Sequence, residues 1–372
     1  MKLKKLFAGV VAAAMIATMS FPAFAALNAT TTDGVDVGGE VSITKTYFGT
    51  GFGEETVKLV IDNGGKPTDI IHSSMTAAEI AAAKNSMTIS IASGQENGIT
   101  VNDTTGEGTF KVKLPDYSRV GTYIYKIHED KGNTAGMTYD EAQRWLVVHV
   151  INNMNGDNYG TGLTCKVGMF TSDPTNLSGD DLKAVKSGGF TNTYKNGNFT
   201  VEKKVKGNMA DRDKVFNFRV TFTGIEHMNG KIKVGVDEIA LTAVDNNTAT
   251  YDFVLTHDQS IKFSNIPYGV TATVNELHVD ENGNKTVIAN APGAKNDVYD
   301  VTYVDNQSVT IGMIKVDDEV VDNTDLTAHI TNTSSEHVDT GVILDNAPYI
   351  LMLTVVAAGA MTLVIKKRRE EE

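Results

Sequence analysis

Residues 199–224 read FTVEKKVKGNMADRDKVFNFRVTFTG and contain two segments in which apolar and polar residues alternate, 199–205 and 216–224. Alternation with a period of two places successive side chains on opposite faces of a β-strand. Lys203 therefore shares the apolar face with Phe199 and Val201, whereas Lys204 points the other way. The stretch predicts two strands that each turn one face to a core, with one lysine on the inward side.

Alternating segments follow one another along most of the chain, and helical periodicity is rare. The other expected strands are VSITKTY (41–47), GTFKVKL (108–114), GTYIYKIHE (121–129), QRWLVVHVI (143–151), GLTCKVGMF (162–170), ATYDFVL (249–255), SIKFSNI (260–266), GVTATVNE (269–276) and VYDVTYV (298–304). Turn sequences such as NMNGDNYG (153–160) and DENGNK (280–285) separate them, which favours antiparallel hairpins and β-sandwiches. We therefore predict an all-β fold, with one helix over residues 76–85 that Thr76 and Glu79 open as a capping box.

Both ends of the chain carry an apolar segment. At the N-terminus, MKLKK precedes LFAGVVAAAMIA and the small-residue site Ala23-Phe24-Ala25, which predicts a signal peptide over residues 1–25. At the C-terminus, residues 349–365 are long enough to cross most of a bilayer core of ~30 Å. The basic residues 366–369 that follow favour a cytoplasmic end. Residues 26 to about 340 are therefore expected outside the membrane.

Composition and length limit the partners, the number of domains and the disulfides that we expect for the exported part. The whole chain has 372 residues and a net charge of −13, which argues against nucleic acid and anionic membranes as partners. Its length favours two domains, which we place at residues 26–195 and 196–335. Cys165 is the sole cysteine, so no disulfide can form within the chain. Its strand-like surroundings predict a buried, unreactive thiol.

Three short motifs recur in the same order in the two halves. Period-2 alternation places the last residue of each motif on the apolar side of its strand. The motifs are V-x-I-x-K (41–45), Y-x-Y-x-I-x-E (123–129) and FTN (190–192) in the first half, and F-x-V-x-K (199–203), V-x-A-x-V-x-E (270–276) and ITN (330–332) in the second. The inward residues are Lys45, Glu129 and Asn192 in one half and Lys203, Glu276 and Asn332 in the other.

An inward lysine, glutamate and asparagine have a specific chemistry. Burial favours the neutral amine and the neutral acid. A neutral amine is a nucleophile toward a carboxamide, and a protonated glutamate could hydrogen-bond the amide oxygen and pass a proton to the departing ammonia. We therefore predict one lysine–asparagine isopeptide bond in each half, with Glu129 and Glu276 as catalytic groups. Snorkelling lysines on ordinary strands are the alternative for either copy taken alone.

These residues resemble the streptococcal backbone pilins and the related collagen-adhesin B-type domains of Gram-positive surface proteins. The resembling pieces are residues 200–224, SIKFSNIPYGVTATVNE (260–276), YIYKIHE (123–129) and FTNTY (190–194). The resemblance implies tandem immunoglobulin-like β-sandwiches with self-formed isopeptide bonds. It assigns Lys45 and Asn192 to the first bond, with Glu129 as helper. Lys203, Asn332 and Glu276 form the second set.

The stretch HVDTG (337–341), followed by the apolar span and basic tail, resembles a sortase sorting signal. The resemblance implies cleavage between Thr340 and Gly341. The threonine is then joined to an amine on a neighbouring subunit or on a peptidoglycan precursor. The usual leucine and proline of such signals are replaced here by His337 and Val338. Lys186 is the first candidate for the acceptor amine between subunits, and Lys183 is the second.

The resulting hypothesis is a structural pilus subunit, anchored to the cell wall and exposed at the bacterial surface, with sortase, peptidoglycan and other subunits as partners. A wall-anchored adhesin or minor pilin that binds a host or bacterial ligand is the main alternative, because binding loops on β-sandwiches have no general signature. An enzyme is not expected, since no H-E-x-x-H or G-x-S-x-G motif is present. No metal or cofactor is expected, and the glycine-rich stretch GTGFGEE (49–55) is interpreted as a loop.

Overall fold

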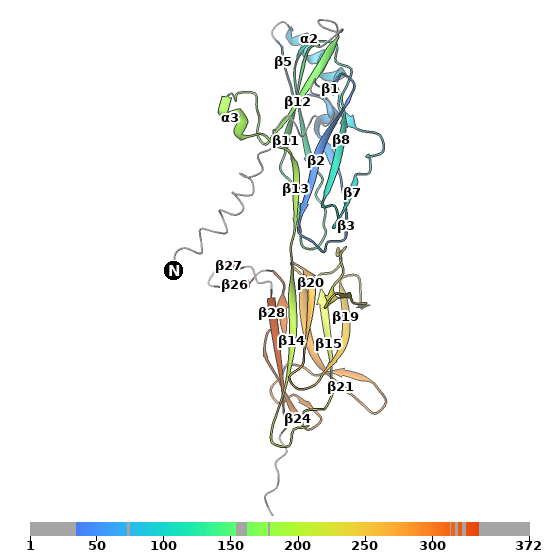
Figure 1. Ribbon diagram of the computed structural model, residues 1–372, viewed down its shortest axis with the longest axis vertical. Coiled ribbons are helices and arrows are strands. Elements are labelled where there is room, and N and C mark those ends of the chain that lie inside the picture. The colour runs from blue at the N-terminus through green and yellow to red at the C-terminus, as the bar shows by residue number, and fades with distance from the viewer. Residues whose placement is uncertain are drawn as a thin grey trace, which may run out of the picture.

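The computed structural model describes residues 35–72, 75–153, 162–177, 179–312, 314–316, 319–321 and 325–334. Two β-sandwiches follow one another along the long axis of the molecule (Figure 1). We call them the N-terminal lobe (residues 35–194) and the C-terminal lobe (residues 196–334). The predicted all-β fold with tandem immunoglobulin-like sandwiches is confirmed. The proposed signal peptide and the segment 336–372 lie outside the described residues.

The N-terminal lobe is formed by two facing sheets. One has the order β1 (Val35–Asp36), β12 (Leu163–Phe170), β11 (Arg144–Asn152), β9 (Gly121–Glu129) and β4 (Leu59–Ile61), with β5 (Asp69–Ile71) also paired to β9. The other has the order β10 (Met137–Thr138), β13 (Gly189–Tyr194), β2 (Glu40–Phe48), β8 (Glu107–Lys113) and β6 (Ser90–Ile91). A short pair, β3 (Glu54–Val57) and β7 (Ile99–Asn102), lies beside them.

The C-terminal lobe repeats this plan. One sheet has the order β17 (Asp237–Glu238), β16 (Lys233–Val234), β20 (Ser260–Pro267), β14 (Asn196–Lys206), β28 (Asp325–Ser334), β24 (Tyr299–Asp305) and β23 (Lys295–Asn296). The other has the order β18 (Thr242–Ala243), β19 (Thr248–Leu255), β15 (Phe216–Thr223), β21 (Thr271–Val279) and β22 (Lys285–Val287), with β25 (Ser308–Thr310) also on β21. A hairpin of β26 (Ile314–Val316) and β27 (Glu319–Val321) precedes β28.

Each lobe closes by pairing an early strand with its last strand. β2 and β13 pair in parallel in the N-terminal lobe, and β14 and β28 do so in the C-terminal lobe. The other named strand pairs are antiparallel, as the hairpin turns predict. Parallel pairing of strands so far apart in sequence needs the whole intervening sandwich as its connection. This pairing brings the two ends of each lobe's chain into contact.

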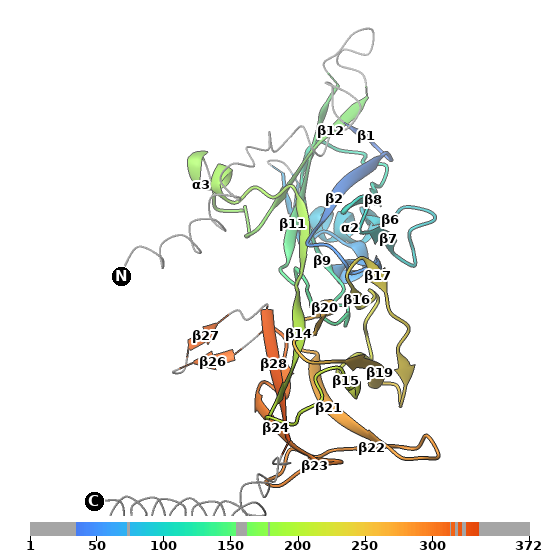
Figure 2. The same ribbon diagram turned by 60° about the horizontal axis from the view of Figure 1, so that its bottom comes forward.

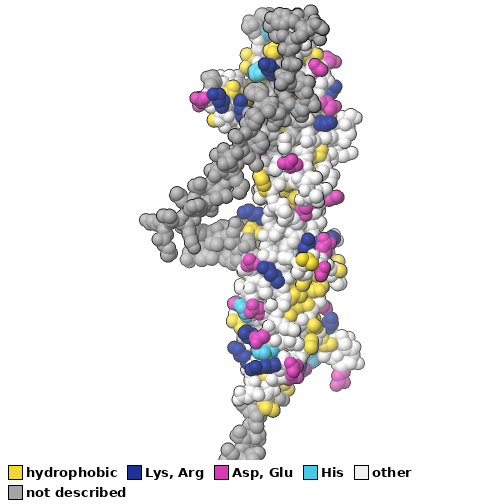
Figure 3. All heavy atoms as spheres, viewed as in Figure 1, with side chains coloured by type: hydrophobic (Ala, Val, Ile, Leu, Met, Phe, Trp, Pro, Cys, Tyr) yellow, Lys and Arg dark blue, Asp and Glu magenta, His cyan; other side chains and the backbone are white. Residues whose placement is uncertain are grey.

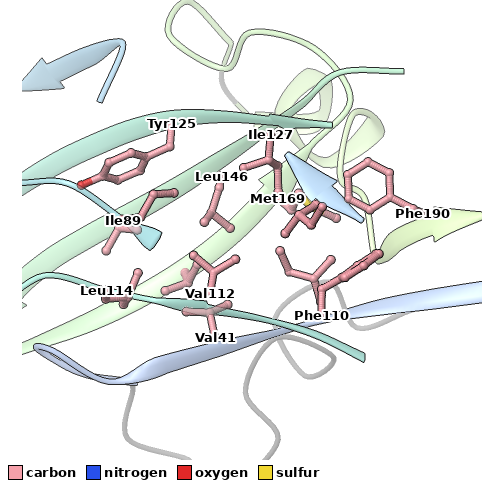
Figure 4. Packing of buried hydrophobic residues seen from close by; sticks show 14 of the residues in the cluster. Val41, Ile89, Phe110, Val112, Leu114, Tyr125, Ile127, Leu146, Met169 and Phe190 are labelled. Atoms are coloured by element: carbon pink, nitrogen blue, oxygen red, sulfur yellow. The ribbon is translucent and has the colours of Figure 1, made fainter. Parts of the chain in front are cut away.

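Alternation along the strands forms one apolar core per lobe. In the N-terminal lobe, residues from both sheets meet between the layers, including Val41 and Val112 from one and Tyr125 and Leu146 from the other (Figure 4). The C-terminal core is rich in phenylalanine, and Phe222 packs edge to face with Phe263 at 5.7 Å between ring centroids. Cys165 is fully buried in the N-terminal core, and burial raises the pKa of its thiol to about 12. The prediction of a buried thiol is confirmed.

The helices are short. α2 (Ala77–Ser86) confirms the predicted helix, displaced by one residue because Thr76 is its N-cap. The capping box forms with both bonds: Glu79 N–H donates to Thr76 Oγ1 at 3.3 Å, and Thr76 N–H donates to Glu79 Oε2 at 2.8 Å. A 3₁₀ turn, η1 (Asp62–Gly65), and a second helix, α3 (Gly179–Ala184), were not predicted. α3 projects from the side of the N-terminal lobe (Figures 1 and 2), and its Leu182 packs against a small cluster of Ile124, Val147 and Phe170.

Polar contacts join the two lobes where β13 leads into β14. The glycine-rich loop at residues 49–53 is tied down by Asp103, whose carboxylate accepts the N–H groups of residues 51–53 at 3.1–3.2 Å. The N–H groups of this loop are therefore bound by a carboxylate of the same chain. Gly51 has a φ of +95°, and an added Cβ there would lie 1.8 Å from Asn265 Oδ1 of the other lobe. Across the same junction, Asn229 Nδ2 donates to the buried Glu55 Oε2 at 2.8 Å.

The surface of the described residues carries both signs of charge. Lysine and arginine side chains are interspersed with aspartate and glutamate on the face seen in Figure 3. Some of these charges form ion pairs at the surface, such as Arg219 with Asp252 at 2.7 Å. None of the helices in the described part of the chain is both long and apolar enough to cross a membrane.

Candidate functional site

Three charged or polar side chains meet inside the N-terminal lobe. Lys45 comes from β2 and Asn192 from β13 of the same sheet, whereas Glu129 comes from the end of β9 in the facing sheet. Each alternates with apolar neighbours that lie in the core, and all three side chains are at most 2% exposed. Strand alternation predicts this inward orientation, and the structure confirms it.

Glu129 lies between the other two side chains. Its Oε2 is 2.5 Å from Lys45 Nζ, and its Oε1 accepts a hydrogen bond of 2.5 Å from Asn192 Nδ2. The aromatic ring of Tyr47 lies beside the amine, with its centroid 4.7 Å from Nζ. The far end of the carboxamide is also bound, because the backbone N–H of Asp140 donates to Asn192 Oδ1 at 2.9 Å.

The C-terminal lobe contains the corresponding set. Lys203 on β14 lies 2.8 Å from Glu276 Oε2 on β21, and Asn332 Nδ2 on β28 donates to Glu276 Oε1 at 2.7 Å. All three side chains are fully buried. The rings of Phe216 and Phe218 lie 4.3 and 5.4 Å from Lys203 Nζ. The neighbouring Lys204 is about half exposed and pairs with Asp258, in agreement with its predicted outward phase.

The two sets share one register. In the parallel pair β2–β13, Lys45 is opposite Phe190 and Asn192 is opposite Tyr47. In the pair β14–β28, Lys203 is opposite Ile330 and Asn332 is opposite Val205. In both lobes the asparagine is therefore two residues beyond the lysine's partner, on the same face of the sheet. Diagonal neighbours of this type are within reach of a long side chain such as lysine.

Burial shifts the pKa values of both buried lysines and of Glu129. Loss of hydration lowers the pKa of Lys45 from 10.5 to about 8, against the opposing effect of Glu129. Burial likewise lowers the pKa of Lys203 to about 8, against Glu276. Burial also raises the pKa of Glu129 above its usual value, against the attraction of Lys45. The amine and acid can therefore exchange a proton without changing the total charge of the pair.

The glutamates meet the amide nitrogens of the asparagines, and this differs from the expected contact with the amide oxygens. In the N-terminal lobe the reason is the Asp140 N–H, which occupies Asn192 Oδ1. The reversed carboxamide would set Asn192 Nδ2 against this N–H, with two donors facing each other. A carboxylic acid in this position could donate a proton to the amide nitrogen Nδ2.

The remaining predicted site residues lie elsewhere. Lys183 is on α3, 71% exposed, and pairs with Asp180 at 2.9 Å. Lys186 follows α3 and forms a β-bridge with Phe170, shortly before β13. The geometry brings neither lysine into a buried triad. Thr340 and Gly341 lie outside the described residues. Within the described residues, no group of three or more His, Cys, Asp or Glu side chains could hold a metal ion.

Sequence reasoning missed the residues that surround the triads. Asp140 precedes β11 in an irregular segment, and Asn296 lies on the two-residue strand β23. Asn296 Nδ2 donates to Glu276 Oε1 at 2.6 Å, and the Tyr303 hydroxyl accepts the Glu276 N–H at 2.8 Å. Neither short element has an alternating pattern long enough to assign a face. Tyr303 is on an expected strand, but alternation does not indicate its hydroxyl partners.

Comparisons with known proteins follow the division into lobes. Residues 68–195 match the family described as "Spy0128-like isopeptide containing domain" (FctA), and residues 197–334 match "Domain of unknown function (DUF7601)". The first match contains Glu129 and Asn192, whereas Lys45 precedes it. The second contains Lys203, Glu276 and Asn332.

Similarities over more than two thirds of the chain include pilins of Streptococcus pyogenes. A pilin of Streptococcus pyogenes serotype M1 is 27% identical over 278 residues, which make up 72% of this chain and 75% of that protein. The crystal structure of the major pilin from Streptococcus pyogenes has a TM-score of 0.43 at 19% identity, and covers 81% of this chain and 99% of its own. The major pilin T3.2 of the same species has a TM-score of 0.41 at 18% identity with the same coverage. Residues 68–195 are therefore similar to the Spy0128-like isopeptide-containing domain, and most of the chain is similar to a streptococcal pilin.

Proposed function

We propose that the chain is a structural subunit of a sortase-assembled pilus on a Gram-positive cell surface. In this proposal residues 26–195 and 196–335 are two domains, each hardened by a self-formed lysine–asparagine isopeptide bond. The observation that carries the proposal is the pair of buried Lys–Glu–Asn triads, each placed in the same register between an early strand and the last strand of its lobe. The relationship to a streptococcal pilin supports the same reading.

The reaction at each triad is an amide exchange. The glutamate takes a proton from the lysine, and the amine's electron pair attacks the side-chain carbonyl carbon of the asparagine. The Nζ–Cγ bond forms, the Cγ–Nδ2 bond breaks, and Nδ2 leaves as ammonia with the proton that the glutamate returns. The carboxylate then takes the second proton that Nζ loses as it becomes an amide nitrogen. Glu129 and Glu276 touch both nitrogens, so each can act first as base and then as acid. No other reactant is needed.

Such bonds suit a fibre under tension. The chain passes through Lys45, Asn192, Lys203 and Asn332 in that order. A covalent link from Lys45 to Asn192 fastens β2 to β13, so that tension on either strand cannot separate the pair. The second link does the same between β14 and β28. The short segment from β13 to β14, which crosses the polar junction between the lobes, carries force through the backbone alone.

The proposed polymer is head to tail. β14 and β28 run in parallel away from the junction, so β28 ends at the far end of the C-terminal lobe, shortly before Thr340 (Figure 1). The candidate acceptors Lys183 and Lys186 belong to the other lobe. Cleavage between Thr340 and Gly341 by a sortase would join the threonine to one of these amines. The last subunit would be joined to peptidoglycan or to its lipid-linked precursor.

Cell-wall extracts test this proposal. We expect a ladder of covalent multimers on denaturing gels, and its loss when Lys186 and Lys183 are both replaced by alanine. The double variant Lys111→Ala/Lys113→Ala, on strand β8, is the matched control and should keep the ladder. Tandem mass spectrometry of the dimer should find Thr340 joined to a lysine ε-amine. A wild-type extract that contains only monomers would contradict the shaft role and would favour the wall-anchored adhesin or minor pilin.

A further inference from the structure

The two asparagine carboxamides differ at their oxygen atoms. Asn192 Oδ1 accepts a 2.9 Å hydrogen bond from the backbone N–H of Asp140. Asn332 Oδ1 is buried and has no hydrogen-bond partner among the described residues. A buried acceptor without a donor costs free energy, so Asn332 Oδ1 lowers the stability of its lobe relative to a paired oxygen. The carboxamide oxygen is also the atom on which negative charge would develop during attack by lysine.

The Asp140 N–H is held in place by a compact set of polar contacts. The Asp140 carboxylate accepts Arg144 Nη2 at 2.6 Å and the Thr191 N–H at 3.1 Å. Arg144 is only 8% exposed, and its Nε donates to Ser187 Oγ at 3.1 Å. Its guanidinium also lies 5.2 Å from the centroid of the Phe190 ring. These contacts tie residue 140 to residues 187–191, the segment that leads directly to Asn192.

We propose that the Asp140 N–H is the oxyanion donor for formation of the Lys45–Asn192 bond, and that Arg144 is the positioning residue that holds it there. The inference rests on the proposed isopeptide chemistry. In the tetrahedral intermediate, the carbonyl electron pair moves onto Asn192 Oδ1, and the N–H stabilises that charge. The electron pair returns to re-form the carbonyl bond as Nδ2 leaves with the proton from Glu129. At Asn332 Oδ1, the part of the chain that the structure describes provides no donor of this type.

The expected effect is kinetic. Loss of one preorganised donor from an oxyanion site slows a reaction by about 10²–10³-fold. A misplaced donor retains part of its effect, so replacement of Arg144 should slow the reaction by at least about 10-fold. The Lys45–Asn192 bond should therefore form faster than the Lys203–Asn332 bond in the same molecule. Both rates can be followed as ammonia loss by mass spectrometry of peptides from samples quenched at intervals after refolding.

The first experiment compares Arg144→Gln, Arg144→Lys and wild type in the full exported chain. We expect the first bond to slow at least about 10-fold in Arg144→Gln, with partial recovery in Arg144→Lys. The Lys203–Asn332 rate should stay unchanged as the internal control. Arg219→Gln is the matched control, since it removes an arginine–aspartate pair from the other lobe, and should alter neither rate. An unchanged first-bond rate in a folded Arg144→Gln would overturn the positioning role.

A second experiment removes only the donor. Replacement of the amide between Tyr139 and Asp140 by an ester, through semisynthesis, exchanges the N–H for an oxygen and keeps every side chain. We expect the first bond to slow by about 10²-fold or more. The inference is wrong if the ester variant folds and forms the bond at the wild-type rate. If wild type itself loses no ammonia at either site, the proposed function fails instead, so the two failures are distinguishable.

Discussion

The two lobes hold the same three side chains in the same strand register, but they surround them differently. Glu129 accepts one carboxamide, from Asn192, whereas Glu276 Oε1 accepts two, from Asn332 and Asn296. Asn192 has a donor at its oxygen, and Asn332 has none among the described residues. The three side chains that the lobes share lie on long, regular strands. The residues that differ around them, Asp140 and Asn296, lie in a connecting segment and on a two-residue strand.

In the proposed reaction, this difference separates the residues that a bond requires from the residues that adjust its rate. Both lobes keep the buried lysine, the bridging glutamate and the diagonal asparagine, so these three are the shared requirement. The Asp140 donor and the Asn296 contact each belong to one lobe. Changes to the shared residues should therefore abolish a bond, and changes to the surroundings should alter only its speed.

The largest expected effect follows loss of a glutamate. Glu129→Gln should leave the Lys45–Asn192 bond unformed, because a carboxamide cannot carry the proton from amine to leaving ammonia. Glu276→Gln should do the same to Lys203–Asn332 alone. Intact-protein mass spectrometry should find one ammonia restored in each variant. Glu202→Gln, on the outward side of β14, is the control and should leave both bonds intact. A Glu129→Gln protein that still forms its bond would end the shared-requirement claim.

Loss of a cross-link should lower stability by similar amounts in the two lobes. Each bond closes a loop of well over a hundred residues, for which the loop-entropy model gives about 4–5 kcal/mol. Asn192→Ala and Asn332→Ala should each lower the melting temperature of the affected lobe by roughly 10–20 °C. Scanning calorimetry should show the other lobe's transition unmoved. A shift of only a few degrees in either variant would show that the bond contributes little there.

The unlinked variants should also gain a pH dependence that wild type lacks. In Asn192→Ala, Lys45 remains a buried amine with a folded pKa of about 8, against 10.5 when unfolded. Between these values the unfolded state binds more protons, so the free energy of unfolding rises with pH across the window. The rise should not exceed about 3 kcal/mol. Asn332→Ala should behave alike through Lys203.

Urea unfolding between pH 7 and about 10 checks this expectation, with the linked wild type as control, because its lysines are amides and do not titrate. The expectation is contradicted if the free energy of unfolding depends on pH in the same way in wild type and in both variants. A rise of this free energy in one variant alone would show that the two amines are not equally buried before the bond forms.

The smallest effect is expected at the exposed neighbour of a reacting lysine. Lys204 is about half exposed and pairs with Asp258 at the surface, and such pairs contribute little to stability. Lys204→Ala should keep the full ammonia deficit and the wild-type melting temperature. A change in the mass deficit would mean that strand phase does not select the reacting lysine.

Most of the long strands follow from the sequence because their alternation extends over seven or more residues. β9 was predicted with the bounds that the structure gives, and β15 differs by one residue. The same alternation placed Lys45 and Lys203 inward, and it placed Lys204 outward. A period of two is a local property, so the sequence alone is enough to assign the face.

The surroundings of the triads could not be predicted, because they depend on contacts between distant segments. Asp140 reaches Asn192 across 52 positions of sequence, from a segment with no periodicity. The parallel closure of each lobe was also not predicted, since turn sequences indicate only hairpins between neighbouring strands. Two short elements, η1 and α3, lack the length needed for a recognisable pattern.

The most direct test of the central claim is the intact mass of recombinant residues 26–340, produced without any sortase. Two self-formed isopeptide bonds predict a mass below the sequence value by two ammonia molecules, with cross-linked peptides joining Lys45 to Asn192 and Lys203 to Asn332. A mass equal to the sequence value in the folded protein would contradict the account in both lobes. A deficit of one ammonia would restrict it to the lobe whose cross-linked peptide is found.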